Sequence, residues 1–305
     1  MKMFLLTISL ATCLPTADTA AECVCQDTPQ TRTASGDIPP QPEFFQQLKS
    51  LKVTVFRSKS AVVEINANRC RLTDTELKEI GKLHQLTDLS LEETRITDQG
   101  LAHLTKLKKL VWLNLYRTDI SDAGLRQIAQ LPALQLLPIG ETRITDRGLV
   151  YLKQATQLTY LGLRGNRITD CGLEQLGDLT KLTGLHLGET RITSTGIQSL
   201  TKMNRLQQLW LTETAITDKA IPYLAKLKSL QQLHIEKTAI SPTGVATLRK
   251  LLPDCQVLDG RRPAGVSTNN VLPASGIVLV LTQKIGSSVF ISQTRRLFRL
   301  PQPSP

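Results

Sequence analysis

Seven consecutive segments of the chain follow one template at a fixed spacing of 24 residues. Their first residues are Leu86, Leu110, Leu134, Leu158, Leu182, Leu206 and Leu230, and an eighth, less regular copy begins at Val62. The template reads L-x-x-L-x-L-x-x-T-x-I-T-D-x-G-L-x-x-L-x-x-L-x-x. One unit of this length cannot bury its apolar face alone, so the period predicts a solenoid of stacked repeats.

Each repeat combines two hydrophobic periods. Its first part alternates as a strand does, so Leu89 and Leu91 are expected to point inward and Ser90 outward. Its second part spaces apolar residues three apart, along one side of a helix. All 56 apolar positions of the eight copies hold an aliphatic residue or Met. That consistency favours one continuous stack over separate globular halves.

The I-T-D segment joins the strand to the helix. Its Thr or Ser is a preferred helix N-cap residue, and the Asp that follows suits the positive end of a helix dipole. Three positions after the L-x-L strand segment most copies carry Thr, for example Thr94 and Thr118, whose hydroxyl can bond turn backbone. These residues are therefore interpreted as structural, and no catalytic residue is assigned.

These motifs resemble the leucine-rich repeat superfamily, in particular the bacterial 24-residue class with T-x-I-T-D-x-G-L. They are also similar to the repeats of F-box substrate adaptors, in which I-T-D likewise precedes the helix. The resemblance covers about residues 62–260. It implies a right-handed α/β solenoid, a horseshoe with a parallel sheet on the concave side and helices on the convex side. Residues 38–61 are too short for an F-box.

The two ends of the chain differ from the repeats. Residues 1–21 are interpreted as an export signal, in which L-A-T-C offers Cys13 as a lipidation site, and residues 22–41 as a linker. We predict an N-terminal cap over 42–61, eight repeats over 62–253 and a C-terminal cap strand over 254–260. Residues 261–305 contribute +6 of the formal net charge of +11. This basic tail is expected to be either a hairpin or disordered.

Composition argues against several classes of function. Cys70 and Cys171 lie four repeats apart, roughly 19 Å by strand spacing, which is beyond the reach of a disulfide. No metal-ligand spacing, phosphate loop or nucleophile elbow is present, so no metal, cofactor or catalytic site is expected. The lysines scattered over the helices do not form a nucleic-acid module.

Residues on the outward positions of the strands are the candidates for ligand contact. Trp112, Leu136 and Tyr160 fall on successive strands and are expected to form an exposed apolar strip, flanked by Pro138. Glycines beside the strip are expected to leave a shallow floor, namely Gly140, Gly162, Gly184 and Gly188. Exposed apolar clusters often mark interaction sites. The complete candidate set is Trp112, Tyr116, Leu136, Tyr160, Arg164, His186, Trp210 and His234.

Charged residues follow the strands at the edge of the same face. Glu-Thr-Arg occurs three times, at 93–95, 141–143 and 189–191, which suggests a ladder of alternating charges. Pro138 cannot donate to the strand ladder and is the expected local defect of the sheet.

The sequence therefore predicts a non-enzymatic, monomeric scaffold of the bacterial cell envelope or exterior that binds a protein or peptide on its concave face. An envelope polysaccharide binder and an intracellular F-box-like adaptor are the alternatives. Periplasmic, envelope-anchored and secreted locations all fit the leader, and a cytoplasmic location fits less well. Contact with a membrane is expected only through the leader or a lipid anchor, and no nucleic-acid partner is expected.

Overall fold

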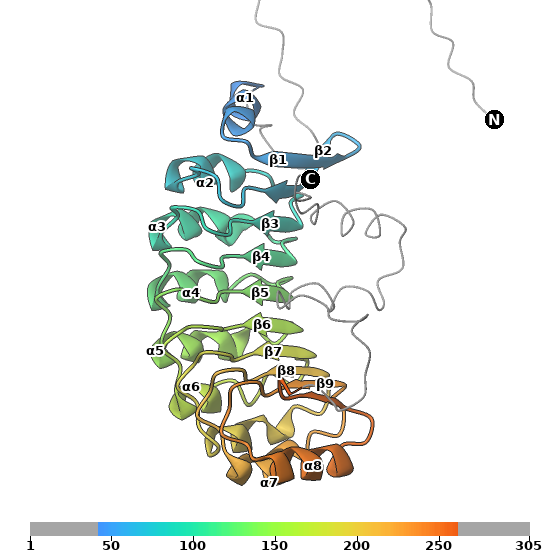
Figure 1. The fold of residues 1–305 in the computed structure, drawn as a ribbon. Coiled ribbons are helices and arrows are strands. Elements are labelled where there is room, and N and C mark those ends of the chain that lie inside the picture. Colours follow the sequence, from blue (N-terminus) through green and yellow to red (C-terminus); the bar gives the residue numbers. More distant parts are fainter. Residues whose placement is uncertain (1–41, 262–305) are drawn as a thin grey trace, which may run out of the picture. The chain divides into compact units, whose positions relative to one another are not determined.

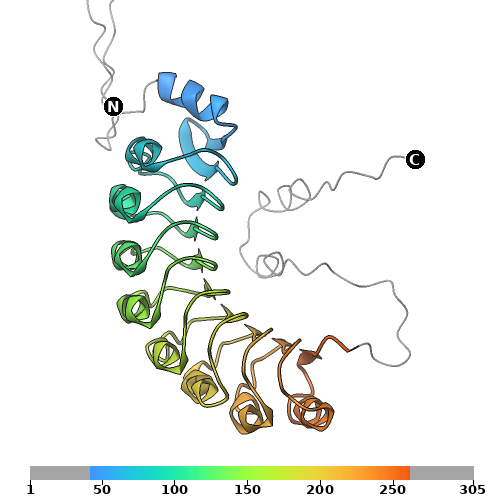
Figure 2. The ribbon, with the colours of Figure 1, turned by 60° about the vertical axis from the view of Figure 1, so that its left-hand side comes forward.

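A computed structural model describes residues 42–261. The chain divides into two compact units, residues 1–36 and 37–305, and all of the described residues belong to the second. The predictions for the export signal, Cys13, the linker and residues 262–305 lie outside the described residues. In the described part, strands and helices alternate from one end to the other, and the strands form the inner layer of a curved stack (Figures 1 and 2).

Ten strands form one sheet whose order is the order of the sequence. The strands are β1 (Thr54–Ser58), β2 (Ala61–Asn66), β3 (Asp88–Ser90), β4 (Trp112–Asn114), β5 (Leu136–Pro138), β6 (Tyr160–Gly162), β7 (Gly184–His186), β8 (Gln208–Trp210), β9 (Gln232–His234) and β10 (Gln256–Leu258). β1 pairs with β2 in antiparallel fashion, and every later pair is parallel. The predicted parallel sheet is confirmed.

Short helices form the outer, convex layer (Figure 2). They are α2 (Asp74–Ile80), α3 (Asp98–Leu101), η1 (Ala102–Lys106), α4 (Asp122–Ile128), α5 (Asp146–Leu149), η2 (Val150–Gln154), α6 (Asp170–Glu174), η3 (Gly196–Lys202), η4 (Asp218–Ala220), α7 (Ile221–Leu224) and α8 (Pro242–Leu251). A further helix, α1 (Pro42–Ser50), lies at the end of the stack. Several of them are 3₁₀ helices, labelled η. The spacing of three between apolar residues explains this, because a 3₁₀ helix has 3.0 residues per turn.

The core is the continuous column of repeat leucines between the two layers. All but two of the predicted apolar positions are buried, and most are fully inaccessible. The exceptions are Ile221, which is half-buried, and Leu251, which is 40% exposed. α8 is a regular α-helix, so the core residue after Leu248 is Leu252, four positions on, and Leu251 turns outward.

Strand pairing is locally reduced at Pro138, as predicted. β4 and β5 share only the Trp112↔Leu136 pair, whereas the other parallel neighbours share three pairs each. The stack is nevertheless unbroken, because the amide of Leu115 donates to the carbonyl of Pro138 at 2.9 Å. The defect therefore costs hydrogen bonds without interrupting the sheet.

Hydroxyl groups close the turns and cap the helices. The Thr94 hydroxyl donates to the carbonyl of Leu91 at 2.6 Å, and the equivalent bond forms in five further repeats. The N-cap prediction is confirmed where the side chain accepts a helix amide, at Thr97, Ser121, Thr145, Thr217 and Ser241. The turn threonines and the N-cap residues therefore both bond to backbone groups, as interpreted from the sequence.

The aspartate of I-T-D has a second role that the sequence did not reveal. The Asp98 carboxylate accepts the backbone amide of Ser121, in the next repeat, at 2.8 Å and the Ser121 hydroxyl at 2.5 Å. The same pair of bonds recurs at every junction with such an aspartate, where the donors are Thr97, Thr145, Thr169, Thr193 and Ser241. We call this inter-repeat contact the aspartate latch.

The template glycine makes room for the latch. A Cβ atom on Gly124 would collide with the Asp98 carboxylate and would lie 2.8 Å from a methyl group of Leu101. One junction lacks the aspartate, because Ser194 stands in its place, and there the glycine position holds Ala220. The smaller Ser194 side chain leaves space for that methyl group. The latch aspartate therefore requires a glycine at this position of the next repeat.

The described ends of the stack have structures of their own. α1 buries Phe44 and Leu48 against the core of the first repeat. β1 adds an antiparallel strand beyond the repeat strands. At the opposite end β10 pairs with β9 in parallel, with Val257 buried opposite Leu233. These segments cover apolar side chains that the terminal repeats would otherwise expose.

Candidate interaction face on the concave sheet

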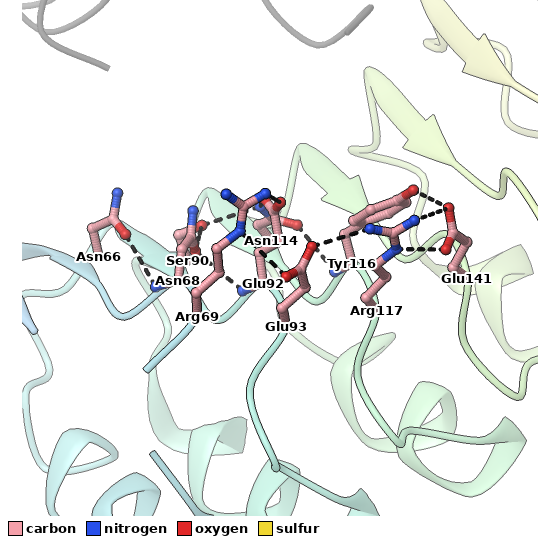
Figure 3. Close-up of polar contacts among 10 residues, drawn as sticks. All are labelled: Asn66, Asn68, Arg69, Ser90, Glu92, Glu93, Asn114, Tyr116, Arg117 and Glu141. Carbon is pink, nitrogen blue, oxygen red and sulfur yellow. Dashed lines mark hydrogen bonds and ion pairs between the residues drawn. The ribbon is translucent and has the colours of Figure 1, made fainter. Parts of the chain in front are cut away.

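The first three repeats carry a connected polar network on the concave face (Figure 3). The Asn68 side-chain oxygen accepts the Ser90 hydroxyl at 2.7 Å and the Glu92 backbone amide at 3.1 Å. The Asn114 amide group donates to Ser90 at 3.1 Å and to the Glu92 carboxylate at 3.3 Å. Ser90 and Asn114 are buried, so these bonds satisfy groups that are costly to leave unpaired.

Ion pairs run along the edge of this network. The alternating residues Arg69, Glu93, Arg117 and Glu141 occupy the same position of successive repeats, each with positive φ. Arg117 pairs with Glu93 at 3.2 Å and with Glu141 at 2.5 Å. The expected charge ladder therefore exists, but its partners are equivalent residues one repeat apart, rather than the Arg of each Glu-Thr-Arg segment. Being exposed, such pairs contribute little to stability.

The later repeats carry a cluster of rings. Trp210 lies between two imidazoles, with ring centroids 5.4 Å from His186 and 5.5 Å from His234, and both pairs are stacked. Tyr160 meets Trp210 edge-on at 6.2 Å. Strand register explains the stack, because His186, Trp210 and His234 are directly opposite one another on β7, β8 and β9. The rings bury much of each other's surface.

Glycines allow the rings to lie against the sheet. A Cβ atom on Gly184 would approach the Tyr160 ring to 2.8 Å, and one on Gly188 would approach His186 to 2.9 Å. The glycines were expected to leave a shallow open floor beside the apolar strip. That expectation is wrong, because the neighbouring rings fill the space above them.

Trp112 and Leu136 lie beside the polar network, on β4 and β5, and Leu136 is paired in register with Tyr160 of the ring cluster. Asp88, Trp112 and Leu136 are neighbours in register on β3, β4 and β5, and all three side chains are half-buried. Asp88 accepts a hydrogen bond from the Thr87 hydroxyl at 2.6 Å. No ion pair to Asp88 forms within residues 42–261. We call these three residues the seam.

Electrostatic environments differ along the face. Burial raises the pKa of the Asp88 carboxyl, which the Thr87 hydrogen bond offsets only in part. Burial, together with the positive charges of Arg164 and His234, lowers the pKa of His186 to about 4. Burial and the Glu141 hydrogen bond raise the pKa of Tyr116 to about 12. At neutral pH His186 is therefore uncharged, and its Nδ1 accepts the Gly188 amide at 3.2 Å.

The eight predicted contact residues fall into three groups. Tyr160, His186, Trp210 and His234 form the ring cluster, and Trp112 and Leu136 belong to the seam. The third group, Tyr116 and Arg164, contacts acids of the edge: the Tyr116 hydroxyl donates to Glu141, and the Arg164 Nε donates to the Glu189 carboxylate at 2.8 Å. Tyr160 is only 5% exposed. The expectation of an exposed strip that includes Tyr160 is therefore wrong, although the three strands do align.

Asp88 was missed as part of the site. Its position beside Trp112 was readable from the 24-residue alignment, but its lack of a cationic partner was not. The described residues contain no group of three or more His, Cys, Asp or Glu that could hold a metal ion. Within the same residues Cys70, Cys171 and Cys255 are free thiols. No helix in residues 42–261 has the length and apolar character needed to cross a membrane.

Comparison with known proteins identifies the repeat. A family model described as "Leucine Rich repeat" matches residues 154–177. The repeats are leucine-rich repeats, and residues 42–261 form a leucine-rich-repeat solenoid, which confirms the predicted fold class. The finer assignment to the bacterial 24-residue class stays a prediction. No curated protein matches the chain.

Several solved structures are similar to the chain. Internalin C2 from Listeria monocytogenes is 27% identical over 61% of this chain and 77% of its own, with a TM-score of 0.48. Internalin F from the same organism is 18% identical over 73% of this chain and 89% of its own, with a TM-score of 0.36. The ectodomain of the Arabidopsis receptor kinase HAESA, solved with a peptide hormone, is 16% identical over 65% of this chain, with a TM-score of 0.48. The chain covers 41% of that ectodomain.

Proposed function

We propose that the protein is a non-enzymatic scaffold that binds a protein or peptide on its concave face, at the seam. One observation carries the proposal. Trp112 and Leu136 are half-buried neighbours beside a carboxylate, Asp88, that no cation of the described residues neutralises. An aromatic and an aliphatic side chain next to an unpaired charge suit a partner that offers apolar and cationic groups together.

The ring cluster favours a peptide over a polysaccharide. Both faces of Trp210 are covered by His186 and His234, and Trp210 and Tyr160 are each 5% exposed. Neither ring offers a flat open face on which a sugar could stack. Trp112 remains, but the carboxylate and leucine beside it suit side chains better than a pyranose ring. The envelope polysaccharide binder is therefore the second candidate.

We also propose that the protein acts in the bacterial cell envelope or outside the cell. This part of the proposal is supported by the leader-like residues 1–21 and by Cys13 in L-A-T-C. Cell fractionation followed by sequencing of the mature N-terminus tests it. A mature chain that begins near residue 22, or at an acylated Cys13, is expected. A chain that retains residues 1–21 in the cytoplasm would instead support the F-box-like adaptor.

Binding is tested with the full chain and two unbiased probes. A displayed library of random peptides and an array of bacterial glycans are each presented to the wild type and to Trp112→Ala. We expect enrichment of peptides that contain a basic residue close to an apolar one, and loss of that enrichment in the variant. Arg147→Ala, on the exposed convex side, is the matched control. Enrichment of glycans alone would replace the proposal with the polysaccharide reading.

A further inference from the structure

The concave face and the C-terminal residues of the chain have complementary charges. The outward strand positions hold four acids and one base, namely Glu64, Asp88, Glu92, Glu236 and Arg164. Residues 262–305 hold five bases and no acid, namely Arg262, Lys284, Arg295, Arg296 and Arg299. The chain as a whole carries +11, so the acidic balance of the outward strand positions runs against the general trend. Opposite potentials of this kind attract charged segments.

We propose that residues 288–301 of this chain bind in cis across the seam and occupy it in the absence of a partner. The inference rests on the proposed function, because it takes the seam to be the binding site for a peptide. The segment reads SVFISQTRRLFRLP. An arginine of this segment neutralises the Asp88 carboxylate, and the apolar residue two positions on covers Trp112 and Leu136.

The spacing of residues in the segment matches the seam. Neighbouring strands lie roughly 4.8 Å apart, so the seam is roughly 10 Å long from Asp88 to Leu136. In an extended peptide, residues two apart lie on the same side, roughly 6.8 Å from each other. Arg296 and Phe298 have this spacing, and Arg299 follows directly. An extended segment can therefore place a guanidinium over β3 and a phenyl ring over β4 and β5.

The connection is long enough for the segment to reach the seam. β10 and β3 are separated by seven strand spacings, which is roughly 34 Å. The 34 residues between Arg261 and Arg296 can span roughly 110 Å when extended. A tethered segment has an effective concentration on the order of millimolar, so modest affinity suffices to keep the seam occupied. An external partner must then displace the segment, which makes it an autoinhibitor.

The two tryptophans provide a direct measurement on the full chain. Trp112 is half-buried, whereas Trp210 is enclosed by imidazoles, so acrylamide quenching of tryptophan fluorescence reports mainly on Trp112. The tested variant is Arg295→Gln/Arg296→Gln/Arg299→Gln. Its quenching constant should exceed that of the wild type by about twofold in low salt, because the ring loses its cover. Added salt should raise the wild-type value toward that of the variant, since screening weakens exposed ion pairs.

Two controls separate docking from a general effect of charge. Lys202→Gln/Arg147→Gln/Arg205→Gln removes the same charge from exposed convex positions and should leave quenching unchanged. Asp88→Lys should raise quenching, and combining it with Arg295→Glu/Arg296→Glu should restore shielding. Equal quenching in the wild type and the tail variant would overturn the proposal, as would a failed charge swap. Shielding that grows with protein concentration would assign the seam to a second copy instead.

The outcome is independent of the peptide-library test. If the tail variant and the wild type quench equally, while the library still yields peptides that need Trp112, the autoinhibitor fails and the binding function stands. If neither the segment nor any library peptide needs Trp112, both proposals fail. If the tail variant binds library peptides about tenfold more tightly than the wild type, the segment competes for the same site.

Discussion

Each repeat contains two regions that follow opposite rules, the helix N-termini and the concave strand positions. At the helix N-termini the same residue types recur, and they bond to one another across every latched junction. On the concave face no residue type recurs through the stack. The difference shows that repetition marks the contacts that join one repeat to the next. The concave positions that depart from repetition are where the partner site is proposed.

The concave face itself divides by the same criterion. Its polar network and its ring cluster satisfy themselves, through hydrogen bonds at one end and stacking at the other. The seam beside them has an aromatic ring, a leucine and a carboxylate that are only half-buried. The variable residues of the concave face therefore differ in how far their side chains are free to contact a partner. The following predictions test this division, from the largest expected effect to the smallest.

Trp210→Ala should be the most destabilising change on the concave face. The side chain is 5% exposed and packs between His186 and His234, so its removal leaves a cavity and unpaired rings. We expect a loss of about 3–5 kcal/mol in the free energy of unfolding. Urea denaturation followed by circular dichroism measures it. A loss below about 1 kcal/mol would show that the ring cluster is an open surface and that the division is wrong.

Gly124→Ala should break one aspartate latch. The added methyl group meets the Asp98 carboxylate and a Leu101 methyl group, and we expect a loss of about 1–3 kcal/mol in unfolding free energy. The protein contains its own control, the junction of Ser194 and Ala220. Asp98→Ser/Gly124→Ala copies that junction and should recover part of the loss. Thermal unfolding compares the stability of the two variants with that of the wild type. A double variant less stable than Gly124→Ala would refute the latch.

These two sites show what the sequence could and could not predict. The repeat period and the leucine positions were sufficient for the fold, because burial of eight stacked units leaves few alternatives. The partner of Asp98 was not predictable from its own repeat, since the donor, Ser121, lies in the next one. The burial of Tyr160 was also missed. It depends on Gly184 and Trp210, in two later repeats, and a row-by-row alignment treats such residues as independent.

Stability should fall in mildly acidic solution because of His186. Its pKa is about 4 in the folded protein, below the ordinary value of 6.5, so the unfolded chain binds a proton first. The free energy of unfolding should therefore decrease as the pH falls from about 6.5 to about 4, and His186 should contribute nothing above about 7. Urea denaturation measures the fall in unfolding free energy between pH 7 and pH 4.5. This fall should be about 1–2 kcal/mol smaller in His186→Asn than in the wild type. The exposed His103→Asn is the control, and equal pH dependence in all three proteins would contradict the assignment.

Trp112→Ala should have the smallest effect on stability and the largest on binding. Trp112 is half-buried and has no ring partner among the described aromatic residues, so we expect a loss of about 1 kcal/mol or less in unfolding free energy. Peptides selected on the wild type should bind about 1–3 kcal/mol more weakly to the variant, as they do when a hot-spot side chain is lost. Trp210 lies on the same face, four strands away. Trp210→Ala should lower stability strongly and, once corrected for the folded fraction, should leave peptide affinity nearly unchanged. Isothermal titration on both variants measures the affinities. If Trp112→Ala instead unfolds the protein while its folded fraction keeps full affinity, the ring is a structural plug, and the seam does not bind a partner.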